Sequence, residues 1–146
     1  MTHPQRCAPV LFLVFNRPER TREVFSAIRA VRPSQLFVAA DGPRPERLGE
    51  AARCSEVRSI ATAVDWPCEI HTLFRDTNLG CGLAVSEAVS WFFSQVLQGI
   101  VLEDDCLPDP SFFDFCTALL ERYCADRRVF KIAGTCLLYT SPSPRD

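Results

Sequence analysis

The sequence predicts an α/β fold with a mostly parallel, Rossmann-like sheet. Short apolar runs alternate with longer amphipathic segments along the chain, and this alternation is typical of parallel sheets covered by helices. The first run, residues 9–15 (PVLFLVF), carries no polar side chain, which indicates a strand buried on both faces. The chain has 146 residues, enough for one domain with a buried core.

The first half of the chain contains two strands and two helices. A helix is expected to begin near Asn16, because asparagine is a favourable N-cap and Pro18 suits the first helical turn. Pro33 ends this helix, since proline is not tolerated in a helix interior. A second strand is expected over residues 35–40. An amphipathic helix is expected over residues 45–63, where apolar residues recur at helical spacing.

The second half of the chain continues the alternation. Alternating apolar residues predict a third strand, and a glycine-rich turn separates it from a mostly apolar helix. After a fourth strand, Asp109 and Pro110 predict the start of a last helix, with Asp109 as its N-cap. The third strand is expected over residues 68–74 and the turn over residues 78–82. The apolar helix is expected over residues 83–98, the fourth strand over residues 99–105, and a fifth strand over residues 129–133.

Composition argues against several classes of protein. The net charge is −2, with 16 basic and 18 acidic residues, so we expect no nucleic-acid partner, which would call for a strongly basic face. No apolar run approaches the ~18 residues of a membrane-spanning helix. The run at residues 8–15 lacks the cleavage site of a secretory signal. Outside residues 136–146 the number of cysteines is odd and no CxxC pair occurs, which favours a reduced, cytoplasmic protein.

A zinc site formed by Cys68, His71 and Cys81 is disfavoured. Residues three apart on a strand point to opposite faces of the sheet, so Cys68 and His71 are poorly placed to share one ion.

The fourth strand ends in three consecutive acids, Glu103, Asp104 and Asp105. Adjacent carboxylates repel one another and are costly to desolvate unless a cation or hydrogen-bond donors share the charge. Ligands of open parallel sheets bind just beyond the carboxyl ends of the strands. An acidic cluster there suggests a hard divalent ion that bridges the protein to a phosphorylated ligand. The alternative is a solvated turn at the end of a strand.

Polar residues also follow the first and second strands, and all these strand ends are expected to share one edge. Arg17 offers planar donors to a phosphate or a base, and Asp41 offers acceptors to a base or a ribose hydroxyl. Asp105 is a candidate ligand for a divalent ion bound to two phosphates. The sequence contains neither GxGxxG after the first strand nor GxxxxGK[ST], which disfavours NAD enzymes and P-loop NTPases.

Four motifs carry a resemblance to a known family. They are PVLFLVFNRPERT (9–21), LFVAADGPR (36–44), FRDTNLGCG (74–82) and GIVLEDDCLPDPSFFDF (99–115). The chain resembles the nucleotide-binding half of GT-A glycosyltransferases, in particular bacterial haemolysin-like sugar transferases and, more distantly, the N-acetylglucosaminyltransferase I family. The last motif is the most specific, since it is similar to the DxD motif of that fold. The resemblance spans nearly all of residues 9–135.

The resemblance implies a nucleotide-diphosphate sugar donor, with UDP as the nucleotide, and a saccharide or glycoconjugate acceptor. It implies Mn²⁺ or Mg²⁺ bound by Asp105, and it allows a peripheral membrane association of the full-length protein. Asp104 is expected to contact the ribose or donor sugar, Glu103 to orient the cluster, and Asp41 to contact the base. The nucleotide pocket is expected to include Phe15, Asn16 and Arg17, with Asn78 and Gly80 near the donor.

The implied reaction is transfer of a sugar to an acceptor hydroxyl, for which the catalytic base is expected beyond residue 135. Two alternatives stay open: a nucleotide-sugar-binding fragment without turnover, and a metal-dependent phosphoryl-transfer enzyme. We expect a disordered N-terminus over residues 1–8 and a truncated domain over residues 9–135. Residues 136–146 (CLLYTSPSPRD) look like a translated frame of a sequencing adapter, so a non-native tail is expected there.

Overall fold

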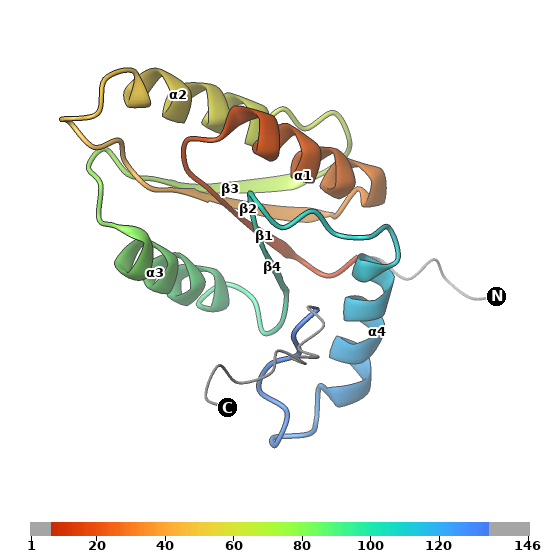
Figure 1. Cartoon of the computed structure of the whole chain (residues 1–146). Coiled ribbons are helices and arrows are strands. Elements are labelled where there is room, and N and C mark those ends of the chain that lie inside the picture. The colour runs from red at the N-terminus through yellow and green to blue at the C-terminus, as the bar shows by residue number, and fades with distance from the viewer. Residues whose placement is uncertain (1–6, 135–146) are drawn as a thin grey trace, which may run out of the picture.

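A computed structural model describes residues 7–134, in which strands and helices alternate strictly along the chain (Figure 1). This order confirms the predicted α/β class. In sequence, the elements are β1 (Val10–Val14), α1 (Pro18–Val31), β2 (Gln35–Ala40), α2 (Glu50–Ala61), β3 (Glu69–Phe74), α3 (Cys81–Phe93), β4 (Ile100–Glu103) and α4 (Phe112–Tyr123).

The sheet is parallel throughout and has the strand order β3-β2-β1-β4. In register, Val14 lies opposite Ala40, and Leu13 lies opposite Glu103. Because every strand runs in the same direction, the loops that follow β1, β2, β3 and β4 all leave from one edge of the sheet. The Rossmann-like sheet predicted from the sequence is therefore confirmed, and the predicted site residues are placed at its carboxyl edge.

The core lies on both faces of the sheet, with β1 at its centre. All five residues of β1 are buried, as the uninterrupted apolar run indicates. Phe12 packs with apolar residues of α1 and α2 and with Phe113 of α4. Leu11 packs on the opposite face, against Phe92 of α3. In Figure 1, α1 and α2 lie on one side of the sheet and α3 lies on the other.

Several predicted element boundaries are corrected by the structure. The second helix begins at Glu50 rather than at residue 45, because Gly49 takes a positive φ of 74° just before it. The third helix spans Cys81–Phe93 instead of residues 83–98. Asp109 does not cap α4, which begins at Phe112; instead its Oδ1 accepts hydrogen bonds from the N–H and hydroxyl of Ser111. The hydrogen bonds from Ser111 to Asp109 are turn contacts, which helical periodicity does not encode.

Two further expectations about local structure are wrong. Asn16 does not cap α1, because its side-chain amide donates to Glu50 Oε1 at 2.8 Å and Arg17 occupies the N-cap position. Residues 129–133 form no strand, and Phe130 is fully exposed. A strand needs a hydrogen-bonded neighbour, and within residues 7–134 the sheet has only the four members given above.

The terminal predictions fall largely outside the described residues. Of the expected N-terminal segment 1–8, only Cys7 and Ala8 are described; Ala8 is buried, and its N–H donates to Thr117 Oγ1 at 3.2 Å. The expected tail, residues 136–146, lies outside the described residues altogether. Within residues 7–134, no helix combines the length and the apolar character needed to span a bilayer.

Candidate functional site

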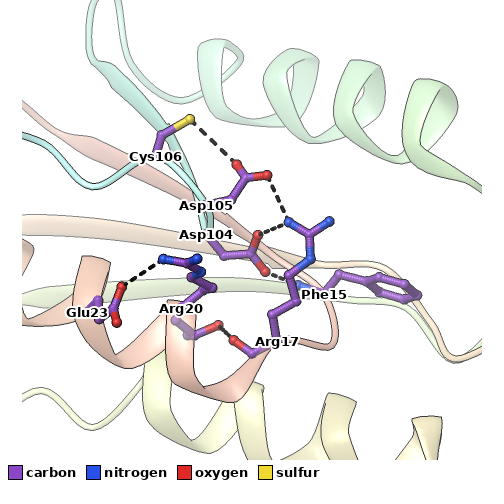
Figure 2. A network of polar contacts seen from close by, with 8 residues as sticks. Phe15, Arg17, Arg20, Glu23, Asp104, Asp105 and Cys106 are labelled. Atoms are coloured by element: carbon purple, nitrogen blue, oxygen red, sulfur yellow. Dashed lines mark hydrogen bonds and ion pairs between the residues drawn. The ribbon is translucent and has the colours of Figure 1, made fainter.

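The carboxyl edge of the sheet brings the ends of β1 and β4 into direct contact. The backbone N–H of Phe15 donates to Asp104 Oδ2 at 3.3 Å (Figure 2). Asp104 is 8% exposed, and this burial raises its pKa, against the opposing effect of the nearby Arg17 guanidinium. The side chain of Asp104 thus links two strands whose final residues are far apart in the sequence.

Arg17 brings a positive charge to the acidic turn. Its Nη1 lies 2.8 Å from Asp105 Oδ2 and 3.8 Å from Asp104 Oδ1, and Figure 2 shows the guanidinium directed at both carboxylates. The hydrogen bond from Arg17 lowers the pKa of Asp105, and the same bond raises the pKa of Arg17. Arg17 and Asp105 are each about half exposed, so solvent reaches this pair.

Glu103 does not join the two aspartates. Along β4, Ile100 and Leu102 are buried while Val101 and Glu103 are exposed, as expected when successive side chains point to opposite faces. Beyond the aspartates, the thiol of Cys106 donates to Asp105 Oδ1 at 3.5 Å. Among residues 7–134, no three His, Cys, Asp or Glu side chains are gathered as a metal-binding group. The positively charged partner of the two aspartates is Arg17.

Asp41, Asn78 and Gly80 come together in a second group, at the ends of β2 and β3. Asp41 Oδ1 accepts from the N–H groups of Gly42 and Leu79 at 2.8 and 2.9 Å. Its Oδ2 accepts from Asn78 Nδ2 and from the N–H of Gly80, both at 3.0 Å. Both carboxylate oxygens therefore bond to protein groups, and they hold the loop that leads into α3.

Gly42 allows this loop to lie close to the end of β2. A Cβ atom on Gly42 would lie 2.3 Å from the backbone carbonyl carbon of Thr77. Asn78 Nδ2 also donates to the carbonyl oxygen of Gly42 at 2.9 Å. The two loops are thus joined by hydrogen bonds and by a backbone approach that only glycine permits.

Sequence reasoning missed a third group, centred on Glu50. This residue is 1% exposed, and its carboxylate accepts from the N–H of Arg44 at 2.7 Å, from Arg44 Nε at 3.0 Å and from Asn16 Nδ2 at 2.8 Å. Hydrogen bonds from Arg44 lower the pKa of Glu50 to about 2. The Arg44 guanidinium lies over the Phe15 ring, with Cζ 5.6 Å from its centroid.

One signal in the sequence points to Glu50. Its position is four, seven and eleven residues before Cys54, Val57 and Ala61, and these four residues are the buried ones of α2. An acid on the apolar stripe of an amphipathic helix needs a buried partner. The partners Arg44 and Asn16 lie in the loops after β2 and β1, and sequence spacing does not reveal them.

Comparisons of the chain with protein-family models, with curated proteins and with solved structures find no match.

Proposed function

We propose that the protein is a GT-A-type glycosyltransferase, which uses a nucleotide-diphosphate sugar and Mn²⁺ or Mg²⁺. UDP is the proposed nucleotide, on the resemblance of the four motifs alone. The observation that carries the proposal is the contact of the Arg17 guanidinium with both Asp104 and Asp105 at the carboxyl edge of a parallel sheet. Such an edge is where ligands of open α/β sheets bind, and the site combines anionic and cationic groups.

The donor set at this edge fits a hard divalent ion. Carboxylate oxygens are the ligands that Mg²⁺ and Mn²⁺ prefer, and the Arg17 guanidinium, within 4 Å of both aspartates, would be displaced by the ion. Asp105, the more exposed of the two, is the proposed direct ligand. When bound, the ion supplies Lewis-acid neutralisation of the charge that develops on the departing diphosphate. Asp104, which also accepts a hydrogen bond from Phe15, is proposed to contact the ribose or donor sugar.

Arg17 has a second role in the proposed reaction. In sugar transfer, the bond from the anomeric carbon to the diphosphate oxygen breaks, and its electron pair leaves with the nucleoside diphosphate. The acceptor hydroxyl oxygen forms the new bond to that carbon and gives its proton to a base. Once displaced from the aspartates, the Arg17 guanidinium donates to the diphosphate oxygens, where negative charge increases. No described residue is assigned as the base.

The remaining predicted residues are proposed to shape the nucleotide pocket. A contact between Asp41 and the base stays a prediction, because the hydrogen bonds of its carboxylate all come from the protein's own loops. In the proposed enzyme these bonds hold Asn78 and Gly80 beside the donor. Glu103 is proposed to orient the acidic turn from the end of β4.

The proposal is tested by calorimetric titration of the protein with UDP in the presence of Mn²⁺. Asp105→Asn is expected to abolish metal-dependent binding, whereas Asp126→Asn is expected to leave it unchanged. Asp126 is a matched control because it also pairs with an arginine, Arg128, at 2.8 Å, but in the turn after α4. Equal binding by both variants would contradict the proposal, and release of phosphate from simple esters would favour a phosphoryl-transfer enzyme instead.

A further inference from the structure

We propose that Arg44, lying over Phe15 and held by the buried Glu50, forms a planar platform against which the nucleoside part of the ligand stacks. This inference rests on the proposed function and adds a second contact region to it. Neither Arg44 nor Glu50 has a role in the cation site formed by Arg17, Asp104 and Asp105. The platform is assigned to the base and ribose, and the cation site is assigned to the diphosphate.

Glu50 fixes the orientation of the Arg44 side chain. Its carboxylate accepts bonds from Nε and Nη2 of the guanidinium and from the backbone N–H of the same residue. A guanidinium bound to a carboxylate through two nitrogen atoms is held in one plane, since both groups are flat. Because Glu50 is 1% exposed, solvent does not compete for these bonds. The low pKa of Glu50 is consistent with a carboxylate that stays charged under ordinary conditions.

Arg44 retains an accessible surface despite these bonds. Its side chain is 39% exposed, and its Cζ lies within cation–π distance of the Phe15 ring. Flat guanidinium and aromatic surfaces are the protein groups on which nucleobases stack.

Phe15, the aromatic part of the platform, lies on the same chain segment as Arg17 of the cation site. Phe15 and Arg17 are two residues apart, or about 7 Å of extended chain. The backbone N–H of Phe15 bonds to Asp104, while its ring points away from the Arg17–Asp105 pair in Figure 2. A ligand with a charged diphosphate and a flat base therefore has a chemically suited partner for each end at one edge of the sheet.

The inference is tested by comparing two probes, UDP and inorganic pyrophosphate, each titrated calorimetrically in the presence of Mg²⁺. Arg44→Lys keeps the positive charge beside Glu50 but removes the flat group. We expect this variant to bind UDP about tenfold more weakly, as loss of one stacking contact predicts, with unchanged affinity for pyrophosphate. Arg47→Met is the control, because Arg47 is an exposed arginine of the same loop, and both affinities should match the wild type.

Glu50→Gln tests whether Glu50 acts through Arg44. The glutamine removes the negative charge that holds the guanidinium, so UDP binding should weaken while pyrophosphate binding does not. In the Arg44→Lys background the Glu50→Gln change should add little, because the effects of two residues that act as a unit are not additive.

Unchanged UDP affinity in Arg44→Lys, or an equal loss for both probes, would overturn the platform alone. A wild-type protein that binds neither probe would overturn the proposed function and the platform together.

Discussion

The guanidinium of Arg17 lies 2.8 Å from the carboxylate of Asp105, and this ion pair joins the loop after β1 to the turn after β4. The two residues are 88 positions apart in the sequence, yet parallel pairing of β1 with β4 places them at one edge. A cation of the protein itself therefore stands where the motif resemblance implies a divalent ion. For the proposed ion to bind, the Arg17 guanidinium must move away from the carboxylates of Asp104 and Asp105.

Replacing Arg17 should strengthen the binding of the ion alone. In Arg17→Met the carboxylates of Asp104 and Asp105 lose their internal partner, and exposed ion pairs are worth up to about 1 kcal/mol, so Mn²⁺ affinity without nucleotide should rise about two- to fivefold. UDP affinity should fall, because a donor to the diphosphate is lost. Free Mn²⁺ measured by electron paramagnetic resonance checks the first effect. Arg20→Met, at an exposed pair with Glu23 on α1, should change neither, and weaker Mn²⁺ binding in Arg17→Met would contradict the competition.

Asp41 should contribute strongly to stability. Its carboxylate accepts bonds from Gly42, Asn78, Leu79 and Gly80, and bonds to a charged group are worth about 1.5–3 kcal/mol each. Because bonds that share one carboxylate are not additive, Asp41→Ala should lower the free energy of unfolding by about 2–4 kcal/mol in a urea titration. Asp76→Ala, at an exposed position of the loop after β3, is the control and should have little effect. An Asp41→Ala protein with wild-type stability but weakened UDP binding would identify Asp41 as a direct contact of the base.

Glu50 should make stability depend on pH in the acidic range. Its pKa is lowered from 4.5 to about 2 in the folded protein, chiefly by the hydrogen bond from Arg44. In that interval the unfolded chain binds more protons than the folded one, so stability falls as pH decreases. Wild type should therefore exceed Glu50→Gln in stability above pH 4.5, and the difference should shrink as pH falls toward 2. Chemical unfolding at a series of pH values measures this, and a constant difference would contradict the assigned pKa.

Two glycines should respond to alanine in opposite ways. A Cβ at Gly42 would lie 2.3 Å from a backbone atom of Thr77, whereas a Cβ at Gly82 in α3 would have no neighbour within 4 Å. Gly42→Ala should cost about 1–3 kcal/mol of stability through overpacking. Gly82→Ala should be neutral or stabilising by up to about 1 kcal/mol, because alanine is the better helix former. Thermal unfolding of the two variants checks the signs, and a Gly42→Ala protein as stable as the wild type would show that the loop is not packed on β2.

Much of the fold could be predicted because the burial of residues and the alternation of strands and helices depend mainly on local sequence. The run at residues 9–15 contains β1, and Pro18 stands at the first position of α1. Residues 129–133 could not be predicted in the same way. They are apolar enough for a strand, but a strand forms only beside a partner, and local pattern does not say whether one is there.

The candidate site likewise has a part that local sequence predicts and a part that depends on tertiary contacts. The acids after β4 and Arg17 after β1 stand out because strand ends of a parallel sheet share an edge. The sequence does not show which groups these side chains bond to, since Asp105 could pair with any nearby donor and Asn16 could equally cap a helix. Arg44 and Glu50 illustrate the limit, because their bond depends on where a loop and a helix meet.

The central claim, that a divalent ion links Asp105 to a nucleoside diphosphate, is tested most directly by the affinity for UDP with and without Mn²⁺. Calorimetric titration of the wild-type chain should give an affinity at least about tenfold higher with Mn²⁺ than after its removal with EDTA, because the ion supplies the charge that joins carboxylate to diphosphate. Equal affinity under the two conditions, or no binding of UDP in either, would contradict the claim.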